Sequence, residues 1–265
     1  FVIRHLSFRM KVTLLGTGTS TGVPMIGCDC RTCRSEDSRD KRLRVSVLIE
    51  HDGKNILIDT SADFRQQMLS HGVTHLEAIL YTHNHYDHIA GFDDIRAFQF
   101  LRRKAPPCYA DEVTTNHIRR TFDYAFGAAT QLGGGLPEVR FTIIDEQPFD
   151  VFGLRVIPVP LIHGRMSILG FRIGGFAYLT DCSEIPEASF ALLEGLDTLI
   201  LDGLRPKPHP THFSIEEAVL QAGRIAPRIT YLTHMNHDVL HEAVERELPP
   251  HVKLGFDGLA FEVTS

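Results

Sequence analysis

The stretch Leu80-Tyr-Thr-His-Asn-His-Tyr-Asp-His-Ile-Ala-Gly91 decides how this chain is interpreted. It follows a mostly apolar run from 76 to 80, which predicts a buried strand. It then supplies four side chains that can bind metal ions: His83, His85, Asp87 and His88. Alternate residues of extended backbone point the same way, so His83 and His85 can converge on one ion. Asp87 and His88 lie just past the strand end and are offset toward a second ion.

The ligand types restrict the choice of metal. Imidazoles with a carboxylate suit zinc, iron or manganese, whereas calcium requires more oxygen ligands. A histidine-rich surface turn is the alternative interpretation, but a solvated turn does not need regularly spaced ligands after a buried strand.

Three apolar runs in the second half of the chain each end in a further metal-binding side chain. The run at 156–162 is followed by His163, the run at 176–180 by Asp181, and the run at 229–233 by His234. One histidine after a strand is usually only a polar cap. Three such residues, together with the cluster at His83, predict a site for two ions.

Composition limits the remaining choices. The chain has 265 residues, of which 43% are hydrophobic, and this is ample for a large core. Its net charge of −6 argues against non-specific nucleic-acid binding. No apolar run approaches membrane-spanning length, and residues 1–9 lack the features of a signal peptide. We therefore expect one cytoplasmic domain over residues 10–265, without membrane association and with residues 1–9 as an upstream extension.

Three of the five cysteines are packed into Gly27-Cys-Asp-Cys-Arg-Thr-Cys33. In a reducing compartment such a cluster indicates a metal site rather than a disulfide framework. The thiolates of Cys28, Cys30 and Cys33 leave one tetrahedral position for a fourth ligand, which is typically a histidine. Cys108 and Cys182 stand alone and are expected to be buried thiols rather than nucleophiles.

Other segments are expected to connect or cover the site. The glycine-rich residues 16–24 lack the Lys-Ser/Thr of a phosphate-binding loop and are interpreted as a turn beside the site. The charged residues 34–44 are interpreted as a solvated connection. From about 95 to 140 the pattern loosens, with the aromatic residues of 121–126 and the glycines of 133–135. This range is expected to be a lid-like insertion.

The H-x-H-x-D-H spacing of His83, His85, Asp87 and His88 resembles the signature of the metallo-β-lactamase superfamily. The resemblance implies an α/β fold, a four-layer αβ/βα sandwich, with a hydrolytic metal site at one edge. It implies two divalent ions, manganese or zinc, that activate a water as hydroxide for attack. One ion would be held by His83, His85 and His163, the other by Asp87, His88 and His234, and Asp181 would bridge them. Asp59 would support the histidines from behind. The alternative for this segment is that Thr60 or Ser61 caps a helix at 62–71.

Two further features resemble the phosphoribosyl cyclic phosphate phosphodiesterase family. Cys28, Cys30 and Cys33 with His237 match its structural zinc site, and His241 is a weaker rival for that zinc. His212, in Thr211-His-Phe-Ser214, matches a histidine of that family that serves as general acid or phosphate ligand. The alternative is that His212 only lies at a helix end, where Thr211 or Ser214 is the cap. His212 and Asp87 are the catalytic candidates. The resemblance implies a phosphodiesterase acting on a small anionic cyclic phosphodiester such as 5-phosphoribosyl 1,2-cyclic phosphate.

Three alternative functions remain. A tRNA 3′-processing nuclease shares the metal motif, but the acidic balance and the lack of a basic arm oppose it. A thioester or lactone hydrolase uses the same fold. A non-catalytic carrier, like the pyrroloquinoline-quinone biosynthesis relative that shares the cysteine cluster, would not need every ligand of a two-metal site. The sequence is also compatible with a homodimer of this chain.

Overall fold

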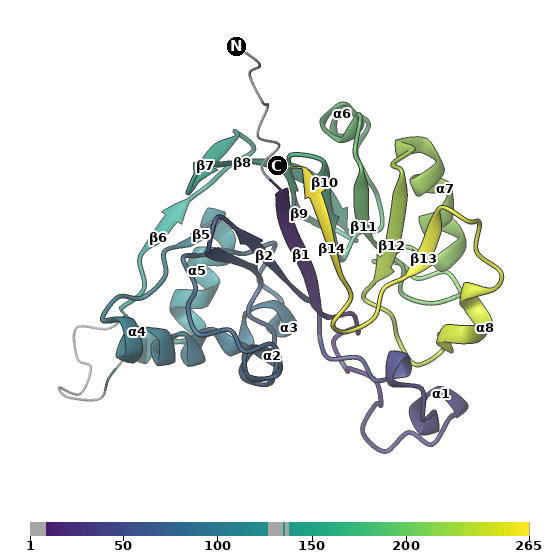
Figure 1. Ribbon diagram of the computed structural model, residues 1–265, viewed down its shortest axis with the longest axis horizontal. Coiled ribbons are helices and arrows are strands. Elements are labelled where there is room, and N and C mark those ends of the chain that lie inside the picture. The colour runs from purple at the N-terminus through teal and green to yellow at the C-terminus, as the bar shows by residue number, and fades with distance from the viewer. Residues whose placement is uncertain (1–8, 127–134, 136–137, 265) are drawn as a thin grey trace, which may run out of the picture.

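The computed structural model describes residues 9–126, 135 and 138–264, which form two seven-stranded β-sheets (Figure 1). The first sheet has the order β14 (Ala260–Thr264), β1 (Arg9–Gly16), β2 (Ser46–His51), β3 (Lys54–Ile58), β4 (Ala78–Leu80), β5 (Cys108–Ala110) and β6 (Phe141–Ile143). The second has the order β13 (Val252–Leu254), β12 (Ile229–Thr233), β11 (Thr198–Asp202), β10 (Phe176–Leu179), β9 (Met166–Ile173), β8 (Leu154–His163) and β7 (Phe149–Val151). Strands β3 to β6 pair in parallel, and so do β10 to β13.

Helices flank both sheets (Figure 1). They are α1 (Arg31–Arg34), α2 (Phe64–Ser70), α3 (Tyr86–Ile89), α4 (Arg96–Arg102), α5 (Glu112–Thr121), α6 (Glu187–Phe190), α7 (Ile215–Ile225) and α8 (His241–Glu245). Short 3-10 turns lie at Ser38–Asp40, Ala90–Ile95, Asp123–Ala125 and Ala191–Leu193. No helix in the described ranges is long and apolar enough to cross a membrane.

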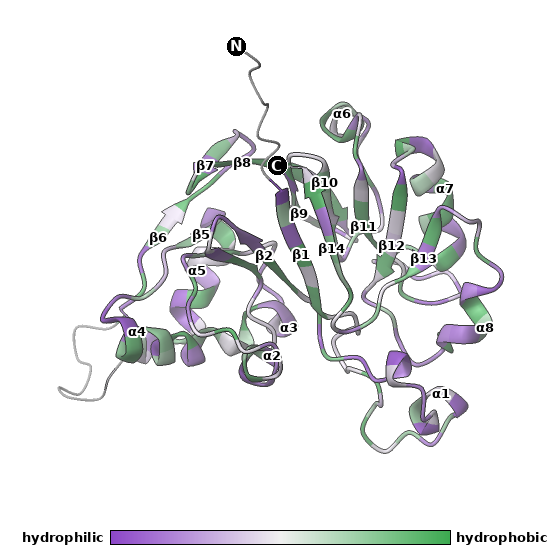
Figure 2. Cartoon of the chain, in the orientation of Figure 1, coloured by the Kyte–Doolittle hydropathy of each residue, from purple (hydrophilic) through white to green (hydrophobic). Residues whose placement is uncertain are grey.

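Three buried clusters define four layers. Strand β3 illustrates the layers, because its alternate side chains belong to different clusters. Ile56 and Ile58 face the second sheet, while Leu57 between them packs on the helices of the first. On the other side, β12 packs against α7 through Leu232, Ala218 and Ala222. Figure 2 shows both hydrophobic and hydrophilic residues along α7, as expected for a helix with one buried face. The predicted four-layer αβ/βα sandwich is confirmed.

Tight local geometry defines two loops. Asp52 and Gly53, between β2 and β3, have positive φ values of 48° and 67°, as a two-residue hairpin turn requires. At Gly16 a Cβ atom would lie 2.0 Å from the backbone oxygen of Arg44, so only glycine fits. The glycine loop also pairs with the chain beside His234, through Thr19 N–H and Met235 O at 3.0 Å. It therefore lies beside the site as predicted.

Two connecting segments differ from the predictions. The segment 34–44 is not wholly solvated, because the Arg42 side chain is fully buried and pairs with Asp40 at 3.2 Å. Helix α2 begins at Phe64, with Asp63 at the N-cap position, so the cap prediction for Thr60 or Ser61 is wrong. Ser61 instead accepts the Asp63 N–H within the preceding turn.

The range 95–140 is only partly described, and its described part is built into the fold. Strand β5 lies inside the first sheet, between β4 and β6, and α5 packs on that sheet through Ile118. Phe122 and Phe126 pack on Phe92, whose ring is fully buried. The prediction of an insertion over the site is therefore wrong for these elements. Gly133 and Gly134 lie outside the described residues.

Candidate metal centre

The ends of four strands bring the predicted ligands together. His83 and His85 follow β4, His163 ends β8, Asp181 follows β10 and His234 follows β12. Two groups of side chains result, each with its ligand atoms within 4.8 Å of one another. The first group is His83, His85, His163 and Asp181; the second is Asp87, His88, Asp181 and His234.

Asp181 is the member common to both groups. Its Oδ1 lies 3.3 Å from His88 Nε2, and its Oδ2 lies 3.2 Å from His234 Nε2 and 4.0 Å from His83 Nε2. A carboxylate offers two oxygens, whereas an imidazole nitrogen offers one lone pair. Asp181 is therefore placed to reach both groups.

Hydrogen bonds behind the histidines fix which nitrogen faces the centre. Asp59 Oδ2 accepts the His88 Nδ1–H at 2.7 Å, and the same carboxylate accepts both Thr82 N–H and Thr82 Oγ1–H at 2.8 Å. Thr211 O accepts the His163 Nδ1–H at 2.7 Å. These bonds leave the Nε2 lone pairs of His88 and His163 available to a metal. The supporting role predicted for Asp59 is confirmed.

Charge within the centre is concentrated and buried. Burial and the neighbouring His88 lower the pKa of His83 well below its usual value, which keeps that imidazole neutral. Burial alone would lower the pKa of His88, but Asp181, Asp87 and Asp59 outweigh it and raise that pKa well above its usual value. Burial likewise opposes ionisation of Asp181, yet His234 and His88 hold its pKa well below the usual range. The Asp181 carboxylate is thus held anionic in a buried position, which favours positive partners.

The donor set fits two divalent cations. The Nε2 atoms of His83 and His88 are buried, and neither has a hydrogen-bond partner among the described residues. Buried polar atoms are normally satisfied, so such atoms indicate missing partners. Imidazole nitrogens and carboxylates suit zinc or manganese, and cations here would also balance the buried anions.

Three site residues have left-handed backbone that sequence patterns do not predict. Asp59, Asp181 and His234 have φ values of 62°, 57° and 61°. Non-glycine residues rarely adopt this conformation, which costs on the order of 1–3 kcal/mol when the surroundings impose it. Each of these residues comes at or just after the end of a strand. The turn places Asp181 and His234 among the candidate ligands, whereas it places Asp59 behind His88.

His212 lies against both groups of ligands. Its ring centroid is 4.7 Å from that of His163 and 4.7 Å from that of His234, onto which it stacks. The N-cap of α7 is Ser214, which forms a capping box with Glu217. The cap alternative therefore applies to Ser214 and leaves His212 free for another role.

Asp202, which the sequence reasoning did not select, orients His212. Its carboxylate lies 3.3 Å from His212 Nδ1 and accepts the Phe213 N–H at 3.0 Å. Burial raises the pKa of Asp202 and lowers that of His212, which favours a protonated Asp202 that donates to Nδ1 and leaves the His212 hydrogen on Nε2. The signal was present, because Asp202 follows the apolar run of β11 just as the ligands follow theirs.

A separate group joins the cysteine loop to the segment after β12. His237 Nδ1 lies 3.1 Å from Cys28 Sγ, 3.7 Å from Cys33 Sγ and 3.8 Å from Cys30 Sγ. Zinc with bonds of about 2.3 Å to sulfur and 2.0–2.1 Å to nitrogen holds tetrahedral ligand atoms roughly 3.5 Å apart, so the spacing fits. The rival His241 instead pairs with Glu245 at 2.9 Å.

The first prediction concerns this cysteine group. We expect Cys30→Ser to lose one of three bound ions per chain and to lower the Tm by roughly 10 °C, because a structural zinc contributes several kcal/mol to folding. The other two ions should stay bound. Elemental analysis checks this, and Cys108→Ala, which removes a thiol outside the group, should retain all three ions. Wild-type protein with only two ions, both lost in Cys30→Ser, would contradict a separate zinc site.

Comparison with known proteins agrees with this geometry. Residues 54–235 match the family model described as the Beta-lactamase superfamily domain, and the chain belongs to the metallo-β-lactamase superfamily. A crystal structure described as a new diphosphatase from the PhnP family is 45% identical, with a TM-score of 0.91, and the match covers 96% of this chain and 97% of that one.

Two curated relatives carry other names. A protein of Porphyromonas gingivalis named octanoyltransferase is 44% identical over 94% of this chain, but the chain spans only 51% of its length. Coenzyme PQQ synthesis protein B of Methylobacterium nodulans is 30% identical over 73% of this chain and 73% of that protein. The structure of zinc-bound PqqB from Methylobacterium extorquens is 21% identical, with a TM-score of 0.77, over 96% of this chain and all of that one. That last likeness establishes the fold alone.

Proposed function

We propose that this chain is a metal-dependent phosphohydrolase that cleaves a small phosphodiester or a diphosphate diester. The observation that carries the proposal is the position of His212, a histidine outside the two ligand groups whose ring contacts both. A phosphate ester gains negative charge during attack, and its leaving oxygen needs a proton. A centre that holds two cations beside an imidazole donor would meet both needs.

The residues divide into metal ligands and a proton donor. His83, His85, His163, Asp87, His88 and His234 would hold two divalent ions with Asp181 between them. Bound there, the ions supply Lewis acidity and lower the pKa of water. His212 would donate a hydrogen bond or a proton through Nε2, and Asp202 would keep its ring in place. Cys28, Cys30, Cys33 and His237 would hold a structural zinc away from the reaction.

Of the related proteins, one favours phosphate chemistry and another carries the name of an acyltransferase. The diphosphatase of the PhnP family covers nearly the whole chain at 45% identity, which favours a phosphate-containing substrate. The octanoyltransferase name belongs to a protein about twice as long. Acyl transfer through a cysteine needs a thiolate, and burial raises the pKa of both Cys108 and Cys182. The remaining cysteines belong to the proposed zinc site.

A substrate panel tests the proposal. Protein loaded with manganese or zinc is assayed with a five-membered cyclic phosphodiester, with ADP-ribose as a diphosphate diester, with octanoyl-coenzyme A and with precursor tRNA. We expect turnover of the cyclic phosphodiester, of ADP-ribose, or of both, and the ratio identifies the bond preferred. Turnover of only the thioester or only the tRNA would contradict the proposal, as would inactivity with all four.

A further inference from the structure

The loop Arg205-Pro-Lys-Pro-His-Pro210 leads from β11 to His212. Its three basic side chains alternate with three prolines. Prolines restrict the unfolded backbone and so favour one arrangement of the side chains between them. The motif is used neither by the proposed metal ligands nor by His212.

Hydrogen bonds close this loop at its base and along its length. Leu204 N–H donates to Phe213 O, and Ile215 N–H donates to Arg205 O, each at 2.9 Å. The Arg205 guanidinium then donates to the carbonyl oxygens of Lys207 at 3.2 Å and Pro208 at 2.9 Å. The loop is therefore held in one conformation beside the start of α7, which reduces the entropy lost when it binds a ligand.

His209 points one imidazole edge back into the loop. Its Nδ1 accepts the Thr211 N–H at 3.4 Å and lies 3.2 Å from Thr211 Oγ1. A nitrogen that accepts a backbone N–H carries no proton, so neutral His209 must carry its hydrogen on Nε2. The His209 ring centroid lies 5.3 Å from that of His212, which places this donor beside the catalytic candidate.

The positive charge of the loop is not neutralised by the protein. Among the described residues, no carboxylate forms an ion pair with Arg205, Lys207 or His209. Burial is the largest cause of the lowered pKa of both His209 and His212, and the charge of Arg205 is a smaller one. In a chain with net charge −6, a loop of unpaired basic residues beside a phosphate-cleaving site favours an anion there.

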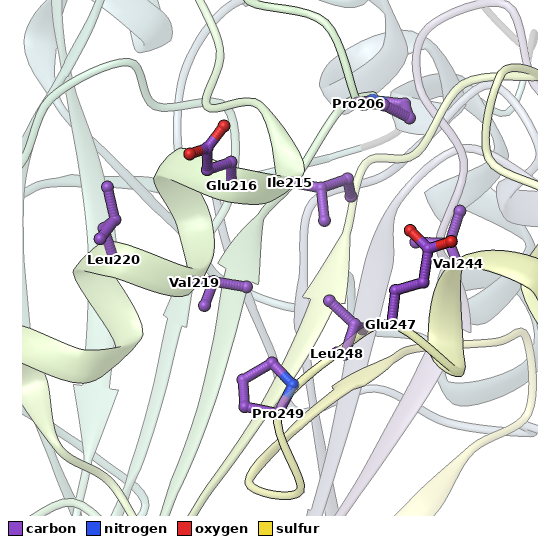
Figure 3. A pocket seen from close by; sticks show the side chains of 9 residues that line it. All are labelled: Pro206, Ile215, Glu216, Val219, Leu220, Val244, Glu247, Leu248 and Pro249. Atoms are coloured by element: carbon purple, nitrogen blue, oxygen red, sulfur yellow. The ribbon is translucent and has the colours of Figure 1, made fainter.

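One side of the loop borders a different feature, an apolar groove between α7 and the chain around α8 (Figure 3). Pro206 lies at its edge, and Val219, Leu220, Val244 and Leu248 supply most of its apolar lining. Glu216 and Glu247 give this groove, with a volume of about 340 Å³, a negative rim. These carboxylates would repel an anionic substrate group. Such a group would therefore bind on the other side of the loop, beside His209.

We propose that the loop at 205–210 is an anion-binding subsite that holds a second phosphate of the substrate, one that is not cleaved. Nε2–H of His209 is its hydrogen-bond donor, and Lys207 and Arg205 supply positive charge. The proposal rests on the proposed function, because it assumes that the reacting phosphate lies at the neighbouring centre. Lys207 and His209 are specificity residues in this account, not catalytic ones.

Matched substrates test the subsite. The p-nitrophenyl ester of thymidine 5′-phosphate is compared with the same ester carrying an additional 3′-phosphate, so that the leaving group is constant. We expect wild-type protein to prefer the 3′-phosphorylated ester, mainly through KM. Lys207→Ala and His209→Ala should each reduce this preference about tenfold, as expected for the loss of one charge-assisted contact. Lys253→Ala, which removes an exposed lysine on β13, should retain the preference.

A binding measurement separates the subsite from turnover. Calorimetric titration of the metal-loaded protein with ribose 5-phosphate should give a Kd about tenfold weaker in Lys207→Ala than in wild type. Lys207 forms no ion pair among the described residues, so this variant is expected to fold even if His209→Ala does not. Hydrolysis of both esters without preference, or equal Kd values in variant and wild type, would overturn the subsite. If neither ester is hydrolysed but the Kd depends on Lys207, the loop binds a phosphate, and the substrate panel decides the proposed function separately.

Discussion

His212→Ala should lose most turnover while it keeps its full metal content. General acid or base catalysis typically contributes about 10²–10⁴ in rate, and His212 is the histidine outside the ligand groups whose ring contacts both. The side chain contributes no atom to the groups shared by Asp181, so elemental analysis should find the two ions in place. His251→Ala, at an exposed position before β13, is the matched control and should retain wild-type activity.

The dependence on leaving group distinguishes two roles for His212. If it donates a proton to the leaving oxygen, the loss should be larger for a sugar alkoxide than for p-nitrophenolate, which departs without help. If it only stabilises charge on the phosphate, the loss should be equal for both. Normal turnover in a variant with both ions bound would remove His212 from the mechanism.

Asp181→Asn should impair both metal positions together. The carboxylate lies within reach of ligands from both groups, and an amide would remove its charge and one of its anionic oxygens. Loss of partners that only support a ligand weakens metal affinity by about 10–100-fold, so loss of a shared ligand should exceed about 100-fold at both positions. Titration calorimetry with manganese measures this.

His163→Ala provides the comparison for Asp181→Asn. His163 belongs only to the group with His83 and His85, so we expect it to deplete one ion and leave the other. The bridging role would be refuted by an Asp181→Asn protein that binds one ion with wild-type affinity.

The side chains that meet at the strand ends are recognisable in the sequence because they follow apolar runs. A buried strand is recognisable from its composition, and its last residue must emerge at the sheet edge, so His163, Asp181 and His234 could be selected without a structure. Asp202 ends such a run as well, but it supports His212 from behind and no resemblance had assigned it a role. Its importance became evident only from its distance to the His212 ring.

Other features depended on tertiary packing that local patterns do not encode. Strand β5 has three residues, too few to show an alternating pattern, so its sequence does not distinguish it from an insertion. Arg42 looked solvated within a charged segment, yet its pairing with Asp40 allows full burial. The left-handed backbone at Asp59, Asp181 and His234 could not be predicted, because none of these residues is a glycine.

We expect hydrolysis to depend on two metal ions at the strand ends. The most direct measurement removes the ions with a chelator and restores manganese stepwise, while bound metal and hydrolysis of bis(p-nitrophenyl) phosphate are both followed. The stripped protein should show no turnover, and activity should return completely only when the second active-site equivalent is bound. Full turnover in the stripped protein, or activity that saturates after one equivalent, would contradict it.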